Sequence, residues 1–267
     1  IRILGDLKEK REAGAIKFDR VIIETTGMAD PGPVAQTFFT DEDIGNYYLL
    51  DSILTVVDAK HAPRQLDDFR EAQEQVGFAD QILMSKTDLV GEADVTALQA
   101  RIRRMNPTTK VHRTERSLID LDKVLNVQGF SLDRALEIDP KFLGEQPQTL
   151  GLGMAGDTHE EHEHHHHHTE VNSVAITISG DLHAKRLNAW MSELLQTKGP
   201  DIFRMKGVLS IKGDPKRFVF QGVHMLFDGQ SGKPWGSDPR TNKLVFIGKN
   251  LNKSELEAGF RQCLALL

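Results

Sequence analysis

The sequence predicts an α/β protein in which a parallel-sheet domain precedes a small α+β domain. Short apolar segments alternate with helical ones through the first part, which is typical of a parallel sheet covered by helices. A glycine-rich stretch and a histidine-rich run then interrupt all periodicity. Strand patterns dominate after that run. We therefore expect a first domain over 1–143, a flexible linker over 144–170 and a second domain over 171–267.

The elements of the first domain follow from apolar periodicity and from the residues that end each segment. Gly14 and Gly77 are expected to end helices, Pro31-Gly32-Pro33 to form a turn, and Asn106-Pro107 to stop a helix. The predicted order is helix 1–14, strand 18–23, helix 34–39, strand 49–58, helix 67–76, strand 81–84, helix 92–105 and strand 110–112.

The second domain is predicted to have the order β-α-β-β-β-α. Its expected strands are 174–178, 208–211, 218–225 and 244–247, with helices over 183–196 and after Ser254. Five residues add basic charge here, and we interpret them as a solvated polar face: Arg204, Lys206, Lys212, Lys216 and Arg217. No aromatic residues are interleaved with them, so they do not indicate an RNA site.

The composition excludes several functional classes. Apolar residues make up 39% and charged residues 27% of the 267 residues, as in ordinary globular proteins. The net charge of −6 argues against a nucleic-acid or anionic-membrane role, and no run approaches the roughly 18 apolar residues of a membrane span. Cys263 is the only cysteine, which fits a reducing, cytoplasmic compartment, and its helical apolar context predicts a buried thiol.

The segment Val21-Ile22-Ile23-Glu24-Thr25-Thr26-Gly27 reads as a buried parallel strand that delivers polar groups to its carboxyl end. In a phosphate site, Glu24 suits hydrated Mg²⁺, the hydroxyls of Thr25 and Thr26 suit phosphate or water, and Gly27 lets a backbone N–H approach a γ-phosphate. The alternative is a buried strand that simply ends in a polar turn, which is common in α/β folds.

A second polar signature, Ser85-Lys86-Thr87-Asp88, follows the strand 81–84. The stem of Lys86 can lie over a guanine base while the Asp88 carboxylate accepts two hydrogen bonds from the base edge, which discriminates against adenine. The alternative is that these residues only open a loop. An apolar strand ending in Asp58 lies between the two signatures, and their order makes a nucleotide site the preferred interpretation.

Together these segments resemble the CobW-type metallochaperone GTPases, a P-loop family related to the nickel GTPases of urease and hydrogenase maturation. The resemblance rests on three segments, Glu24–Pro31, Val56–Ala59 and Ser85–Leu89, and continues in Asp201–Leu209 and Gln221–His224. It implies a GTPase in which Glu24 positions Mg²⁺ or its water and Gly27 senses the γ-phosphate. Thr25 and Thr26 would lie beside the phosphates, Lys86 and Asp88 would select guanine, and Ser85 stands where many GTPases have Asn.

Two family motifs are absent from the 267 residues. No segment reads G-x-x-x-x-G-K followed by Ser or Thr, and a Cys-x-Cys-Cys motif is impossible with one cysteine. Because Ile1–Leu7 resembles the segment that follows those cysteines, we expect that the chain starts late and lacks more than about 30 residues of the family pattern. The chain alone is then expected to hydrolyse GTP negligibly. A natural remnant that has lost nucleotide binding is the alternative.

The run from His159 to His168 contains seven of the eleven histidines of the chain, with glutamates between them. Imidazoles suit Zn²⁺, Ni²⁺, Co²⁺ and Cu²⁺, and a flexible segment suits capture and transfer better than a rigid structural site. A purification tag and a solvated spacer are the alternatives. The candidate ligands are His159, His162, His164, His165, His166, His167 and His168, whereas His61, His112, His183 and His224 occur singly and read as structural.

The sequence thus predicts a GTP-hydrolysing metal chaperone that delivers a transition metal to a client metalloprotein, with zinc as the default and cobalt or nickel open. The alternative is a metal-buffering or client-binding module whose GTPase half is vestigial.

Overall fold

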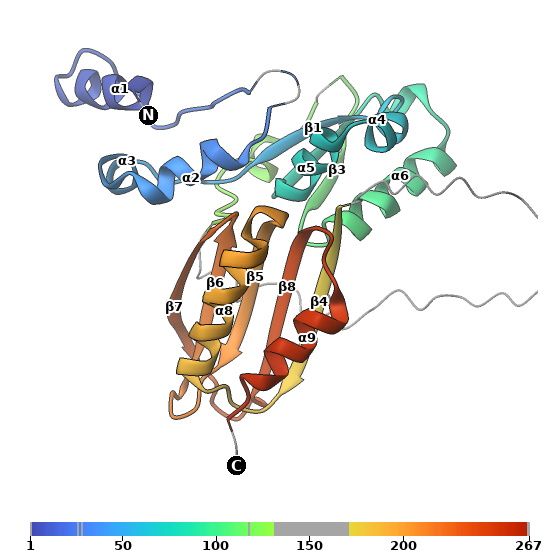
Figure 1. The fold of residues 1–267 in the computed structure, drawn as a ribbon. Coiled ribbons are helices and arrows are strands. Elements are labelled where there is room, and N and C mark those ends of the chain that lie inside the picture. Colours follow the sequence, from blue (N-terminus) through green and yellow to red (C-terminus); the bar gives the residue numbers. More distant parts are fainter. Residues whose placement is uncertain (1, 26, 28, 117, 131–170, 266–267) are drawn as a thin grey trace, which may run out of the picture.

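The computed structural model describes residues 2–25, 27, 29–116, 118–130 and 171–265, which form two packed parts (Figure 1). The first part contains α1 (Arg2–Glu12), α2 (Gly32–Thr40), α3 (Glu42–Tyr47), β1 (Leu54–Asp58), α4 (Ala62–Asp68), α5 (Arg70–Phe78), β2 (Gln81–Ser85), α6 (Glu92–Met105) and β3 (Lys110–Arg113), with short 3₁₀ turns at Thr87–Leu89 and Leu121–Lys123. The second contains β4 (Val171–Ser179), α8 (Ala184–Lys198), a 3₁₀ turn at Gly199–Asp201, β5 (Ile202–Ser210), β6 (Lys216–Val223), β7 (Leu226–Pro234), β8 (Thr241–Lys249) and α9 (Lys253–Gln262).

The first sheet is parallel, as predicted, with strand order β1-β2-β3. In the central strand β2, Ile82 and Met84 are fully buried, which explains the continuous apolar run in its sequence. The apolar stripe of α6, formed by Val95, Leu98 and Ile102, packs into the same core as residues of α4 and α5.

The predicted strand over 18–23 does not form, and this prediction was wrong. Residues 21–25 have no regular structure, and Ile22 is 85% exposed. An apolar segment becomes a buried strand only where a neighbouring strand pairs with it and a layer covers it. Among the described residues β1 pairs with β2 alone, and the side chain of Val56 on β1 is itself 63% exposed. Glu24 and Thr25 therefore do not stand at a strand end in this structure.

The predicted helix over 67–76 is two helices. Phe69 is extended, with φ −127° and ψ 117°, so that α4 ends before it and α5 begins after it. The second helix then continues through Gly77 to Phe78. Polar residues flank Phe69 on both sides, so the sequence pattern does not show that the helix is interrupted there.

The second sheet is antiparallel, with strand order β4-β8-β5-β6-β7. Helices α8 and α9 cover one face of it, where Leu187 and Phe260 pack against Phe246 of β8 and other strand residues (Figure 1). The strand β7 was not predicted from the sequence. Its sequence contains Gly229, Gly232 and Pro234 and few apolar residues, a composition that is tolerated on an edge strand.

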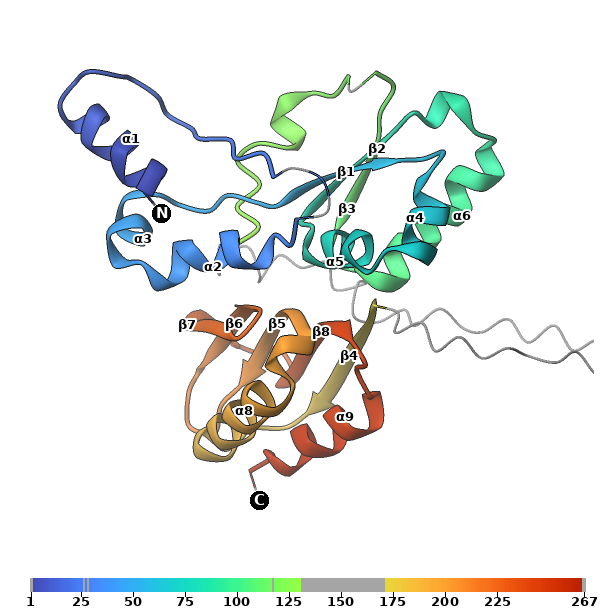
Figure 2. The same cartoon turned by 45° about the horizontal axis from the view of Figure 1, so that its top comes forward.

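The first domain lies across one end of the second sheet (Figure 2). There it packs against the sheet face that α8 and α9 leave uncovered. Phe203, Val223 and Ile247 belong to the same buried cluster as the core of the parallel sheet. The rings of Phe78 on α5 and Phe203 on β5 stack with centroids 5.3 Å apart. One face of the second sheet is therefore part of the hydrophobic core of the first domain, while a second core lies between that sheet and its own helices.

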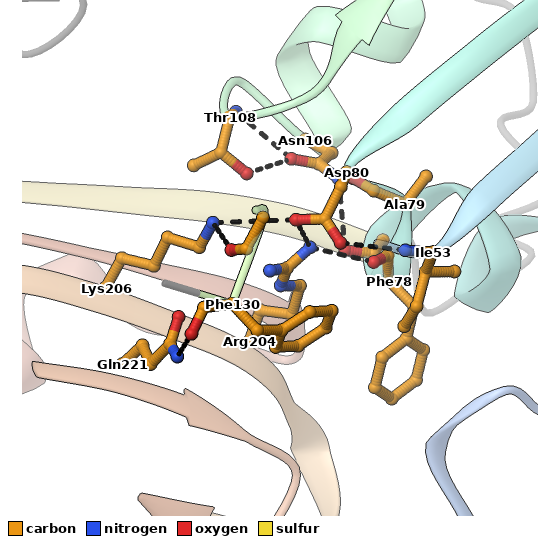
Figure 3. Close-up of polar contacts among 12 residues, drawn as sticks. Ile53, Phe78, Ala79, Asp80, Asn106, Thr108, Phe130, Arg204, Lys206 and Gln221 are labelled. Atoms are coloured by element: carbon orange, nitrogen blue, oxygen red, sulfur yellow. Dashed lines mark hydrogen bonds and ion pairs between the residues drawn. The ribbon is translucent and has the colours of Figure 1, made fainter. Parts of the chain in front are cut away.

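A buried ionic cluster lies at the centre of this contact (Figure 3). The Asp80 carboxylate, next to the start of β2, lies 2.7 Å from an Arg204 guanidinium nitrogen and 3.6 Å from Lys206 Nζ, both on β5. It also accepts a hydrogen bond of 2.9 Å from the backbone N–H of Ile53. Arg204 is 1% exposed, so the interpretation of this residue as part of a solvated face was wrong. Its charge is compensated instead by a carboxylate of the other domain.

Two further predictions were tested in the described residues. Cys263 is buried, and burial raises the pKa of its thiol to about 11. In the described part of the chain, no helix is long and apolar enough to cross a bilayer.

Candidate functional site

The candidate nucleotide site lies where β1 and β2 end side by side. Asp58 is the last residue of β1 and is the register partner of Ser85, the last residue of β2. The N–H of Ala59 donates to the Ser85 carbonyl at 2.9 Å, which extends the pairing past the strand ends. Because both strands run in the same direction, their polar ends meet at one edge of the sheet, as the sequence predicts.

Lys86 leaves β2 in the left-handed region, with φ +58°, which is uncommon for a residue other than glycine. Its ammonium donates to Asp58 Oδ2 at 2.7 Å, and its side chain is half-exposed. Asp88 lies in the following 3₁₀ turn and is exposed. Thr87 Oγ1 donates to the Thr114 carbonyl at 3.4 Å, so the turn is tied to the residue after β3. A lysine stem and a free carboxylate are thus available together at this edge.

Asp58 holds several donors at once. Oδ1 accepts the backbone N–H groups of Lys60 and His61 at 2.9 and 3.2 Å, and Oδ2 accepts His61 Nδ1 at 3.0 Å besides Lys86. Burial alone would raise the pKa of Asp58, but the hydrogen bonds from Lys86, His61 and the two backbone groups outweigh it and hold that pKa well below its usual range. The carboxylate is therefore ionised at neutral pH.

In its described residues, the Glu24–Gly27 segment is hydrogen-bonded to α5 and not to the sheet edge that carries Lys86 and Asp88. Glu24, Thr25 and Gly27 are exposed, and Gly27 has φ +61°, a conformation that suits glycine, whereas Thr26 lies outside the described residues. The side-chain amide of Gln75 on α5 donates to the carbonyls of Gly27 and Ala29 at 3.1 and 3.0 Å. Within the described residues, no hydrogen bond or ion pair joins this segment to Lys86 or Asp88, so the structure does not bring the two predicted motifs into contact.

All seven histidines of the proposed metal run, His159 to His168, lie outside the described residues. In the part of the chain that is described, no group of three or more His, Cys, Asp or Glu side chains could hold a metal ion. Two of the single histidines have polar partners: His61 contacts Asp58, and His112 Nε2 lies 2.6 Å from Gln81 Oε1. The buried Nδ1 atom of His224 has no hydrogen-bond partner in the described part of the chain. Burial, with smaller effects of Lys123 and Lys110, lowers the pKa of His112.

Sequence reasoning missed two contacts that organise this region, those of Asp58 with Lys86 and of Gln75 with the Gly27 segment. Asp58 was recognised as a strand-end acid, but nothing in the sequence shows that it takes Lys86 as its partner. Gln75 is one polar residue among several on a short helix, and its contact with the Gly27 segment depends on the tertiary fold. Nothing in the sequence indicates that the backbone of Lys86 has a positive φ either.

Two models of known protein families match parts of this chain. A family model described as the CobW/HypB/UreG nucleotide-binding domain matches residues 2–113, and one described as the cobalamin synthesis protein cobW C-terminal domain matches residues 171–264. The zinc chaperone YjiA of Escherichia coli is 36% identical over 258 residues, which cover 96% of this chain and 74% of YjiA. The zinc-regulated GTPase metalloprotein activator 1 of Schizosaccharomyces pombe is 26% identical over 263 residues and is covered to 62% of its length.

The crystal structure of Zn(II)-bound YjiA GTPase from E. coli superposes on this structure with a TM-score of 0.81 at 34% identity. The match covers 98% of this chain and 76% of the YjiA chain. The similarity therefore extends through both domains, and this chain spans between about three fifths and three quarters of the length of these relatives.

Proposed function

Because the chain belongs to the CobW/HypB/UreG family, we propose that it is the greater part of a GTP-hydrolysing metallochaperone that delivers zinc to client metalloproteins. The observation that carries this proposal is the pair Lys86 and Asp88 at the end of β2, beside the Asp58 end of β1. Both relatives described above carry zinc in their names, and the S. pombe protein is also named a GTPase.

At the base side of the nucleotide, Lys86 and Asp88 select guanine. The exposed carboxylate of Asp88 accepts two hydrogen bonds from the base edge, and the stem of Lys86 covers the base. Ser85 stands where many GTPases have Asn, and its backbone already accepts a hydrogen bond from Ala59. Adenine presents the opposite donor pattern and leaves Asp88 unpaired.

At the phosphate side, the Glu24–Gly27 segment senses the γ-phosphate. Gly27 offers its N–H from a left-handed turn, and Thr25 and Thr26 supply hydroxyls beside the phosphates. Glu24 is a single exposed carboxylate, so it fits Mg²⁺ only as a partner of the ion's water or as one ligand beside phosphate oxygens. Mg²⁺ would neutralise charge that develops on the phosphates. The Gln75 side chain of α5 is hydrogen-bonded to the carbonyls of Gly27 and Ala29, so a movement of this segment on nucleotide binding would also move α5.

The cargo metal is captured by the histidine run. His159, His162 and His164 to His168 offer imidazoles for reversible binding, and the neighbouring glutamates raise the local negative potential. Zinc is the preferred cargo because the relatives are named for it, and cobalt and nickel suit the same ligands. GTP and GDP then stabilise different arrangements of the Gly27 segment, and hydrolysis makes release to the client directional.

The test is GTP and ATP turnover by the full-length gene product with and without Zn²⁺. Slow, GTP-selective hydrolysis that responds to zinc supports the proposal. Asp88→Asn replaces the base-accepting carboxylate with an amide, so GTP affinity should fall roughly 100-fold while affinity for xanthosine triphosphate rises. Asp94→Asn, on an exposed face of α6, is the matched control. Unchanged GTP affinity in Asp88→Asn would contradict the assignment.

A metal-buffering or client-binding module is the second candidate, because the histidine run offers metal ligands whether or not a nucleotide is bound. For this candidate, the affinity of the histidine run for zinc should not depend on whether GTP or GDP is present. We expect negligible GTP hydrolysis by the 267-residue chain itself. GTP-dependent turnover by this chain would contradict that expectation, and zinc binding without any nucleotide binding by the full-length product would favour the buffer.

A further inference from the structure

Asp58 lies beside the guanine-selecting residues but has no role in the function proposed above. We propose that Asp58 is a positioning residue for guanine nucleotides, which holds the Lys86 stem in place before the base arrives. This inference rests on the proposed function, because it concerns the same base-binding edge. It adds a residue from β1 to a site that the sequence assigns to the β2 end alone.

The geometry of Lys86 shows why the side chain needs a partner. The residue is half-exposed, and its backbone is held at φ +58°, a conformation that costs free energy for a side-chain-bearing residue. A lysine side chain also has large rotamer freedom, and fixing it on binding opposes association. The 2.7 Å contact with Asp58 Oδ2 restricts that freedom in advance.

Asp58 is itself firmly placed. It is the last residue of β1, in register with Ser85, and its Oδ1 atom accepts two backbone N–H groups of the following turn. Its side chain is only 24% exposed. A carboxylate fixed by the backbone on one oxygen can hold a mobile lysine with the other, whereas an exposed partner would move with it.

The hydrogen bonds of Asp58 also argue against a direct role. A carboxylate offers about four acceptor positions, and here Lys60, His61 by two groups, and Lys86 fill them. No position remains for the base edge or a metal ion unless one of these contacts breaks. Asp58 therefore acts on the nucleotide through Lys86, and Asp88 alone sets which base is accepted.

The test is a double-mutant cycle on binding of a fluorescent GDP to the full-length gene product. Asp58→Asn keeps the acceptor oxygen for the turn but removes the charge that holds Lys86, so GDP affinity should fall roughly fivefold, the scale of a partly exposed ion pair. In a Lys86→Ala background the same substitution should have no further effect. The preference for GDP over xanthosine diphosphate should stay unchanged, since Asp88 is intact.

Matched controls separate this role from a merely structural one. Asp68→Asn breaks the exposed Arg64–Asp68 ion pair of α4 and should leave affinity unchanged. His61→Ala removes one donor from Asp58 but leaves Lys86 held, so affinity should change less than twofold. An effect of Asp58→Asn that persists in the Lys86→Ala background, or an equal effect of His61→Ala, overturns the inference. Absence of guanine binding by the unaltered protein overturns the proposed function as well.

Discussion

Lys206 is a cation enclosed at the contact between the two domains. Its ammonium donates to the Gly129 carbonyl at 3.0 Å and lies 3.6 Å from Asp80, which Arg204 also contacts. One carboxylate thus faces two cations. Burial first, and then the Arg204 charge, lower the pKa of Lys206 to about 8, although Asp80 opposes the shift. The folded protein therefore releases this proton more readily than the unfolded chain does.

This difference predicts how stability depends on pH. The unfolded chain keeps the proton up to the ordinary lysine pKa, so between pH 8 and about 10.5 unfolding takes up a proton and its free energy rises with pH. The free energy of unfolding of wild type relative to Lys206→Met should therefore increase, by on the order of 3 kcal/mol, from pH 7 to pH 10. Urea titrations at each pH measure it. With Lys253→Met, an exposed lysine, the difference should stay flat.

Single residues also show where sequence reasoning stops. The basic character of Arg204 and Lys206 was visible, but their burial was not, because the partner Asp80 lies on another domain. Cys263 was placed correctly, since the apolar stripe around it is local in sequence and its periodicity reports the buried face. Burial that depends on local periodicity can be predicted, whereas burial that depends on a distant partner cannot.

Among the elements, α6 ends at a residue that binds a neighbouring helix. Asn106 is fully buried, and its Nδ2 donates to the carbonyls of Val76, Gly77 and Ala79 at 2.9, 3.1 and 2.8 Å. These carbonyls lie at the end of α5 and just before β2, and Figure 3 shows Asn106 beside Ala79. One amide thus satisfies backbone acceptors that water does not reach.

Replacing Asn106 should therefore loosen the packing of α6 on α5 and β2. Asn106→Ala leaves the buried carbonyls of Gly77 and Ala79 without this donor, whereas the Val76 carbonyl still accepts the Ala79 N–H. Each unsatisfied group costs about 1–3 kcal/mol, so a total loss of about 3 kcal/mol in the free energy of unfolding is expected. Circular dichroism during urea unfolding measures it. Asn46→Ala, on the exposed surface of α3, should change stability by less than about 0.5 kcal/mol. Equal effects of the two substitutions would contradict the role assigned to Asn106.

Some elements are easier to predict from the sequence than others, and the differences have physical causes. The strand β2 was predicted because its centre, 82–84, is apolar and buried on both faces. The edge strand β7 was missed because an edge tolerates glycine and proline. The segment 18–23 has the composition of a buried strand but lacks a paired neighbour in the described structure, so composition alone predicted it wrongly. Strand formation requires partners that a local pattern does not report.

For the molecule as a whole, Asp80 joins the two domains and also organises the start of the first sheet. Its N–H donates to the Ile53 carbonyl at 2.8 Å, its carboxylate accepts the Ile53 N–H, and the same carboxylate pairs with Arg204 of β5. Gly129 passes so close that an added Cβ would lie 2.6 Å from the Asp80 carboxyl group. The Asp80 side chain therefore contributes both to the domain contact and to the start of β1 and β2.

Removing the Asp80 charge should weaken the contact between the domains, so that they no longer unfold together. Asp80→Asn leaves Arg204 and Lys206 as buried cations without a carboxylate, and breaking a buried pair in this way costs about 3–5 kcal/mol. Trp190 and Trp235 both lie in the second domain, so their fluorescence reports that domain, whereas far-UV circular dichroism reports both. In wild type the two unfolding curves should coincide, because one core spans the domains, and in Asp80→Asn they should diverge. Asp67→Asn breaks a more exposed ion pair with Arg101 and should leave the curves coincident. Coincident curves in Asp80→Asn, with a loss no larger than that of Asp67→Asn, would show that the apolar contact alone holds the domains together.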